Sequence, residues 1–394
     1  MNVERTTVTP PTRRARPTGR RAVSLTLALI ALLALAFAPV SAADGPRASE
    51  MMVAETVAAS IDGFGERVPA SSGVVDRVNR RLSSLFGGSD PEVPGVRASA
   101  AVASPMPFTS VGFELPEGAD GVWFRTHGPE GWSSWTHLEA IDLDDGPDLG
   151  TDEAADAVDR EFSELAWVGE ATHLEVDTAA GYPVGGVTAH VADTMGLAGG
   201  PVETVTGLLS DAGEEARGRP DVIRRSQWGA NENWRRGNPR YAEVGQGIVH
   251  HTATRNYYSR DEAPAIVRSI YHYHTQVLGW ADIGYNLLVD RFGRIYEGRA
   301  GGLERGVVGA HARGHNTGTF GISVIGNYHD APARQVAFDA LTDAIDWQFD
   351  VHGISGRGTY QGRSTLIGHR DVGSTVCPGY YLYRRLGEIR SAVG

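Results

Sequence analysis

The side chains best suited to chemistry are histidines and one cysteine at the expected ends of strands. A buried strand over residues 248–251 ends in His250 and His251, and another over residues 365–369 ends in His369. Cys377 follows after residues 370–376, which suffice for a loop to fold back over an ion. Imidazole nitrogens and a thiolate are typical zinc ligands, and a catalytic zinc ion keeps three protein ligands and one water. We therefore predict a zinc site here.

Two choices stay open at this point. Neighbouring residues on a strand point to opposite faces, so only one of His250 and His251 can face the ion. Cys377 is the single cysteine of the chain and has no partner for an internal disulfide. Such a thiol is buried and inert, paired between chains, or used as a metal ligand.

A domain of alternating strands and helices has to position these ligands. Strands are expected over residues 285–290, 295–297 and 319–326 as well, and the last of these is apolar throughout, as in the centre of a sheet. Helices are expected from Asp261 to His274 and over residues 332–351, where apolar residues recur at helical spacing. The fold class predicted for residues 221–394 is α/β, a mixed central β-sheet flanked by helices.

The rest of the chain divides by composition. Residues 106–195 contain short apolar runs separated by turns rich in glycine and aspartate, including residues 143–147, which predicts a β-rich, sandwich-like domain. Residues 43–105 and 196–220 have the composition of linkers, the first mostly irregular.

Residues 1–42 have the pattern of a signal peptide. Five arginines lie between residues 13 and 21, an apolar run follows over residues 22–40, and Val40-Ser41-Ala42 fits signal peptidase. A permanent anchor is the alternative, because the run approaches the ~20 residues that span a bilayer. Arg20-Arg21 also fits the twin-arginine export route. We expect a secreted protein with no stable membrane span after the signal is removed.

The charge of the chain excludes one class of partner. The net charge is -12, and all 36 basic residues are arginine because the chain contains no lysine. Binding to nucleic acid requires clustered positive charge, so we do not expect a nucleic-acid partner.

Residues 221–390 contain ordered motifs that resemble the peptidoglycan recognition protein family, also called type-2 amidases, here in the form of a secreted bacterial member. The motifs are Arg-Ser-Gln-Trp-Gly-Ala at 225–230, Ile-Val-His-His-Thr-Ala at 248–253, Gly-Trp-Ala-Asp-Ile-Gly-Tyr-Asn at 279–286, Tyr-Glu-Gly-Arg at 296–299, Gly-Ala-His-Ala at 309–312, Gly-His-Asn at 314–316, Ile-Ser-Val-Ile-Gly-Asn at 322–327, Gly-His-Arg-Asp at 368–371 and Thr-Val-Cys-Pro-Gly at 375–379.

The resemblance implies a zinc-dependent N-acetylmuramoyl-L-alanine amidase that acts on the muramyl peptide of peptidoglycan, in association with the cell wall. It implies three zinc ligands, two catalytic residues and three substrate contacts, which are respectively His250, His369 and Cys377; Tyr285 and Thr375; and His311, Asn316 and Arg299. One departure is His315, where the family more often has tyrosine.

Two other interpretations fit parts of the pattern. Family members that only bind peptidoglycan commonly lack the cysteine ligand, whereas Cys377 is present here. A structural zinc site usually has four protein ligands, whereas only three good candidates are found. Both observations favour an enzyme.

Overall fold

The computed structural model describes residues 57–60, 102–141, 144–177, 187–196 and 219–393. The predicted signal peptide and almost all of both predicted linkers lie outside these residues. All described residues belong to one compact unit, which begins at Met52. Among them, no helix is long and apolar enough to cross a membrane.

The C-terminal domain contains the predicted mixed sheet. Its six strands lie in the order β16-β10-β13-β11-β12-β9. The pairings β16-β10, β10-β13, β13-β11 and β12-β9 are parallel, and β11-β12 is antiparallel. The strands are β9 (Val222–Ile223), β10 (Gln246–His251), β11 (Leu287–Val289), β12 (Ile295–Glu297), β13 (Thr319–Val324) and β16 (Leu366–Gly368). Every residue of the central strands β10 and β13 is buried, as expected for parallel strands covered on both faces.

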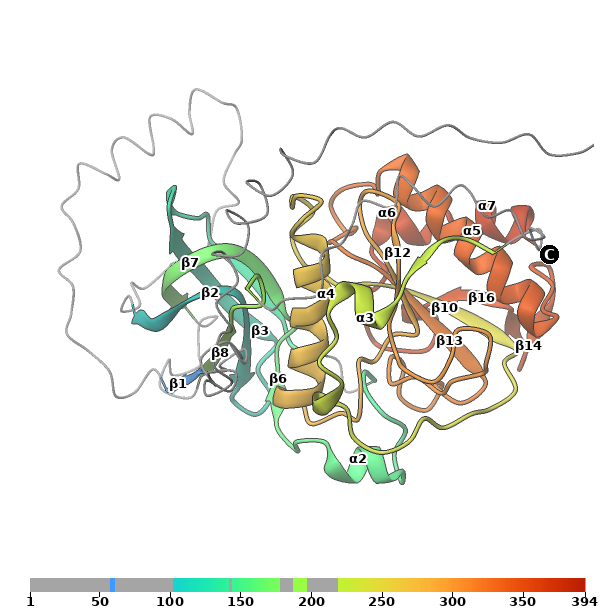
Figure 1. The fold of residues 1–394 in the computed structure, drawn as a ribbon, viewed down its shortest axis with the longest axis horizontal. Helices are drawn as coiled ribbons and strands as arrows, with labels where there is room; N and C mark the ends of the chain where they lie inside the picture. Colours follow the sequence, from blue (N-terminus) through green and yellow to red (C-terminus); the bar gives the residue numbers. More distant parts are fainter. Residues whose placement is uncertain (1–56, 61–101, 142–143, 178–186, 197–218, 394) are drawn as a thin grey trace, which may run out of the picture. The chain divides into compact units, whose positions relative to one another are not determined.

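Helices cover both faces of this sheet, which confirms the predicted α/β class (Figure 1). Side chains alternate along β11: Leu288 packs with helix α4 (Ala263–His272), while Leu287 and Val289 pack with helix α5 (Gln335–His352). Helix α4 continues as a π-helical turn, Tyr273–Val277, and α5 ends at Gly353, whose φ of 65° suits glycine. The shorter helical elements are α3 (Arg225–Trp228), Glu232–Trp234, His369–Asp371, α6 (Tyr380–Tyr383) and α7 (Leu386–Ala392).

The preceding domain is β-rich, as predicted, but its strands form one sheet instead of the two stacked sheets of a sandwich. The order is β1-β8-β2-β7-β3-β4, with β5 paired to β3 and β6 to β2. Figure 1 shows this sheet curved, and the rings of Phe113 on β2 and Phe124 on β3, on either side of β7, lie 5.4 Å apart in its core. Curvature thus buries the apolar residues that a second sheet would otherwise cover.

The bounds of this domain extend beyond the predicted range. Its strands are β1 (Val57–Ser60), β2 (Val102–Leu115), β3 (Gly121–Gly128), β4 (Gly131–Trp132), β5 (Thr136–Glu139), β6 (Glu161–Phe162), β7 (Ala166–Asp177) and β8 (Thr188–Ala192). Strand β1 and the start of β2 therefore fall in the segment expected to be irregular. A short helix, α2 (Asp152–Asp156), lies between β5 and β6. In the C-terminal domain, β14 (Thr359–Tyr360) and β15 (Arg363–Ser364) form a small separate hairpin.

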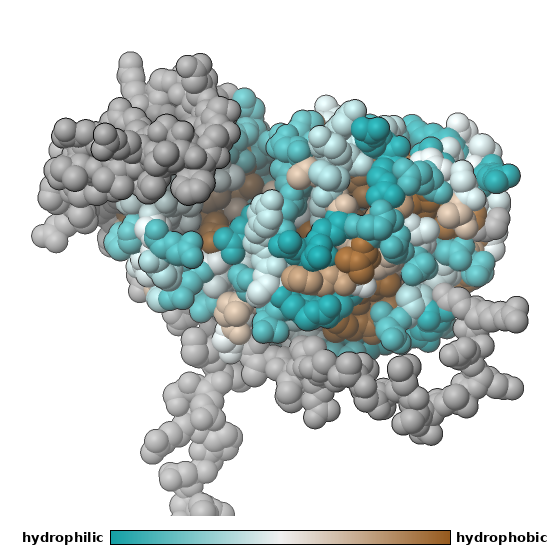
Figure 2. Space-filling view, turned by 90° about the horizontal axis from the view of Figure 1, so that it is seen from above, coloured by the Kyte–Doolittle hydropathy of each residue, from teal (hydrophilic) through white to brown (hydrophobic). Residues whose placement is uncertain are grey.

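The described surface is mostly polar. Figure 2 shows hydrophilic residues over much of one face, with hydrophobic side chains visible between them. The large apolar side chains are mainly in three buried clusters, one on each face of the C-terminal sheet and one inside the curved sheet.

Candidate metal centre

Parallel pairing of two strands brings the two predicted histidine ligands together. Val249 on β10 pairs with Gly368 on β16, so the following residues, His250 near the end of β10 and His369 just after β16, lie next to each other at the carboxyl end of these strands. The two imidazole rings lie 4.5 Å apart, and both side chains are buried. The sheet register alone therefore places two potential nitrogen ligands side by side.

The loop after His369 returns the third predicted ligand to this edge. The backbone N–H of Arg370 donates to the carbonyl of Cys377 at 2.9 Å, which closes the loop. Cys377 Sγ then lies 3.7 Å from His250 Nδ1. Potential ligand atoms of His250, His369 and Cys377 all lie within 4.8 Å of one another. The structure thus brings together the three residues named from the sequence.

The geometry also separates the adjacent histidines of β10. His251 points to the other face, where its Nδ1 accepts a hydrogen bond from the backbone N–H of Tyr328 at 3.1 Å. The backbone N–H of His251 donates to Cys377 Sγ at 3.3 Å. His250 is therefore the member of the pair whose ring lies in the cluster.

A further histidine orients His250. His250 Nε2 lies 3.0 Å from Nδ1 of His311, which leaves His250 Nδ1 facing Cys377. Burial, followed by the neighbouring His369 and His311, holds the pKa of His250 well below its usual range. Burial likewise lowers the pKa of His311 to about 3. Both rings are neutral near pH 7, and neutral imidazole is the form that binds metals.

The chemistry of this cluster fits a zinc ion. Two imidazole nitrogens and one sulfur, all buried, match a zinc site with one coordination position left for a non-protein ligand. Burial raises the pKa of the Cys377 thiol well above its ordinary value, so a neighbouring cation would be needed to hold the thiolate near neutral pH.

The predicted catalytic residues flank the cluster. The Tyr285 ring is half-buried, 5.3 Å from the His250 ring. Burial, followed by Glu164 and Asp145, raises the pKa of Tyr285 well above 10, so its hydroxyl stays protonated and can donate. Thr375 is half-buried, and its Oγ1 accepts from the Cys377 N–H at 3.1 Å, which shapes the turn into the ligand.

The three predicted substrate contacts are buried and bonded within the protein. Asn316 Oδ1 accepts from the N–H groups of His311 and Ala312 at 2.7 and 3.0 Å. Arg299 forms a two-bond ion pair with Glu153 and donates to the carbonyls of Ile283 and Val308. Contact of these side chains with a substrate stays a prediction, because each has hydrogen-bond partners within the protein. The partner of the His311 ring is His250, a predicted metal ligand.

The sequence reasoning missed a segment that crosses this site. Residues 144–158, called the acidic strap below, connect β5 towards β6 and contain six acidic and no basic residues. Asp145 Oδ1 lies 3.6 Å from His369 Nε2. The run of acids was the available signal, but residues 143–147 were interpreted only as a turn.

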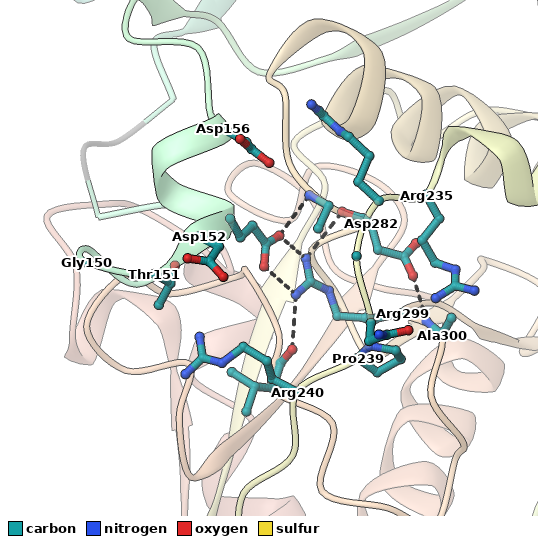
Figure 3. Close-up of a pocket in the computed structure, with 16 residues that line it drawn as sticks. Gly150, Thr151, Asp152, Asp156, Arg235, Pro239, Arg240, Asp282, Arg299 and Ala300 are labelled. Atoms are coloured by element: carbon teal, nitrogen blue, oxygen red, sulfur yellow. Dashed lines mark hydrogen bonds and ion pairs between the residues drawn. The ribbon is translucent and has the colours of Figure 1, made fainter.

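A polar cleft of about 540 Å³ lies between the strap and residues 235–240. Figure 3 shows Arg299 pointing towards helix α2 of the strap, with Asp152 and Asp156 on that helix and Asp282 and Arg235 from the C-terminal domain around it. Charged groups of both signs thus line this cleft, which is built around Arg299 and contains none of the three predicted metal ligands.

Comparisons with known proteins concern the domain that carries the cluster. Residues 240–380 match the family described as N-acetylmuramoyl-L-alanine amidase (Amidase_2). The chain is 33% identical over 170 residues to Peptidoglycan-recognition protein SC1a of Drosophila melanogaster, which covers 42% of this chain and 83% of that protein. It is 35% identical over 170 residues to a human N-acetylmuramoyl-L-alanine amidase, which covers 42% of this chain and 28% of that protein. Among solved structures, human PGRP-IBETAC in complex with glycosamyl muramyl pentapeptide is 31% identical, with a TM-score of 0.38 over 43% of this chain and 96% of that one.

Proposed function

Because the chain belongs to the family of peptidoglycan-recognition proteins and N-acetylmuramoyl-L-alanine amidases, we propose that it is a zinc-dependent amidase. Its substrate would be the amide bond between N-acetylmuramic acid and L-alanine in peptidoglycan. The observation that carries this proposal is the buried cluster of His250, His369 and Cys377, whose ligand atoms lie within 4.8 Å of one another. Three ligands favour a site that keeps one position for reaction.

The metal would be held by His250, His369 and Cys377, and when bound it supplies a Lewis acid that activates water and polarises the amide carbonyl. Tyr285 contributes a protonated hydroxyl beside the cluster, in a position to donate to the developing oxyanion. Thr375 holds the turn before Cys377, and its hydroxyl would assist at the oxyanion together with Tyr285. His311 keeps His250 in the orientation that turns Nδ1 towards Cys377.

The remaining features of the proposal concern substrate and location. Arg299 and Asn316 would bind the peptide part of a muramyl peptide, the guanidinium by pairing with a carboxylate as it pairs with Glu153 here. The signal-like segment over residues 1–42 supports export to the cell wall. The partner would be peptidoglycan, and the acidic chain gives no reason to expect nucleic acid.

The test is mass spectrometry of products from defined muropeptides, with and without a chelator. We expect about one zinc ion per chain and release of free stem peptide that stops when the chelator is added. The variant Cys377→Ala should lose both zinc and cleavage, whereas Val376→Ala, at an exposed neighbour, should keep both. Full cleavage by metal-free Cys377→Ala would refute the mechanism. Binding of muropeptides without cleavage by the zinc-loaded protein would identify a recognition module instead.

A further inference from the structure

Carboxylates of the acidic strap lie against the predicted functional residues. Asp145 reaches the metal cluster, 3.6 Å from His369 Nε2. Asp144 accepts from the Ser374 N–H at 3.0 Å, in the loop that leads to Cys377. The side chains of Asp144 and Asp145 thus lie over the loop and the histidine that form one side of the metal site.

Farther along, Asp148 is bonded to the predicted substrate contact Asn316. Its Oδ1 accepts from Asn316 Nδ2 at 2.7 Å and from the Gly314 N–H at 2.8 Å. Its Oδ2 accepts from the Thr317 hydroxyl at 3.0 Å. The Asn316 backbone N–H also lies 3.4 Å from Oδ1, so one carboxylate takes four donors from the segment 314–317.

Glu153 on helix α2 pairs with the third functional position, Arg299. The guanidinium donates to Glu153 through both Nη1, at 3.0 Å, and Nη2. The Glu153 side chain also accepts from the Ala281 N–H at 3.1 Å and is only 12% exposed. This is the two-bond geometry with which an arginine would bind the carboxylate of a peptide.

The strap is also longer than the connection requires. Strands β5 and β6 end and begin at Glu139 and Glu161, and the connection between them is long enough to hold helix α2. The strap bears six acidic residues and no basic one, and it lies against a cleft that includes Arg235, Arg236, Arg240 and Arg299. The strap's Asp152, Glu153 and Asp156 are part of the cleft lining, and the rest of that lining carries these four arginines and one acid, Asp282, so the strap is complementary in charge to the residues that it faces.

We propose that the acidic strap, residues 144–158, covers the predicted substrate contacts Asn316 and Arg299 and thereby keeps the folded chain in a latent state. Asp145 lies against the predicted metal ligand His369, while Asp148 and Glu153 take the donors that carboxylates and carbonyls of a stem peptide would use. The identity of the competing ligand as a muramyl peptide rests on the proposed function. The occlusion itself rests on contacts in this chain alone.

The test compares the zinc-loaded full chain with the double variant Asp148→Ala/Glu153→Ala. The control Glu130→Ala/Asp159→Ala removes the same two residue types at exposed positions outside the strap. Two readouts are independent of turnover: the rate at which EDTA removes zinc, and the affinity for N-acetylmuramoyl-L-alanyl-D-isoglutamine by calorimetry. Each single variant is measured as well, with circular dichroism to establish that it is folded.

We expect the double variant to lose zinc at least about tenfold faster and to bind the ligand about tenfold more tightly than wild type, since one hydrogen bond to a charged group corresponds to roughly that factor. The control should match wild type. Equal rates and affinities in all folded forms would overturn the proposal, and so would weaker ligand binding, which would make the strap part of the binding site. If the double variant loses zinc faster and binds the ligand more tightly but no form releases stem peptide, the proposal for the strap holds and the proposed amidase activity is rejected.

Discussion

His311 offers a prediction that separates support of the metal from contact with substrate. If His250 binds zinc through Nδ1, its Nε2 carries the proton and donates to His311 Nδ1 at 3.0 Å. The substitution His311→Leu keeps much of the side-chain volume but removes this acceptor. The His250 ring is 1% exposed, so water cannot replace the lost partner.

The expected loss follows from that burial. A buried donor without a partner costs about 1–3 kcal/mol, and loss of the group that supports a ligating histidine typically lowers metal affinity by about 10–100-fold. These two estimates agree, because about 1.4 kcal/mol corresponds to a factor of ten. The variant His311→Asn places an amide near the position of Nδ1, and we expect it to recover most of the affinity.

The assay is zinc affinity by competition with a chromophoric chelator, on variants whose zinc-free forms have the circular dichroism of wild type. Packing makes this check necessary, because a Cβ built on Gly309 or Gly321 would lie 2.4 Å from the His311 ring, so the ring is tightly enclosed. Unchanged zinc affinity of His311→Leu, together with a raised KM for muropeptide, would refute the reasoning and make His311 a substrate contact.

Two further predictions concern Tyr285 and two buried histidines. Tyr285→Phe should keep zinc but lower kcat about 10²–10³-fold, since one donor to a developing oxyanion is removed. Metal analysis together with steady-state kinetics checks this prediction. Loss of zinc from the variant would assign the tyrosine a structural role. Burial, with His190 as a lesser cause, lowers the pKa of His272 to about 4, and burial, with Arg299, lowers that of His274 to about 3. Below pH ~6.5 the unfolded chain therefore binds more protons at these positions. Between pH 7 and 5 these two histidines alone should lower stability by up to about 2–3 kcal/mol per pH unit, and the buried His250 and His311 act in the same direction. Urea midpoints that stay level over this range would contradict it.

The metal cluster could be predicted from the sequence because its geometry is local to strand ends. Because β10 and β16 are adjacent parallel strands, His250 and His369 lie side by side at the carboxyl end of the sheet. The short loop from His369 to Cys377 limits the positions that the sulfur can reach. The choice between His250 and His251 needed the structure or the family resemblance, since alternation along a strand says only that the two differ.

Partners in long-range contacts could not be predicted in the same way. Arg299 and Asn316 were expected in a groove, but their bonds to Glu153 and Asp148 join segments more than a hundred residues apart, and no periodicity encodes such pairs. The apolar runs of the preceding domain indicated strands correctly. Whether those strands form one curved sheet or two stacked ones depends on pairings such as β2 with β8, which composition does not specify.

The packing of the two domains limits how the strap could be released. All ten residues of α4 are buried, because the curved sheet covers the face that the C-terminal sheet leaves free. Arg268 on this helix donates to the carbonyls of Thr194 and Trp228, one from each domain, and Tyr273 donates to the Ser163 carbonyl. Separating the domains would expose this apolar helix and leave a buried guanidinium without acceptors, a cost well above that of a few carboxylate bonds. Movement of the strap alone would therefore open the metal cluster at a lower free-energy cost, while the β-rich domain stays in place in the folded protein.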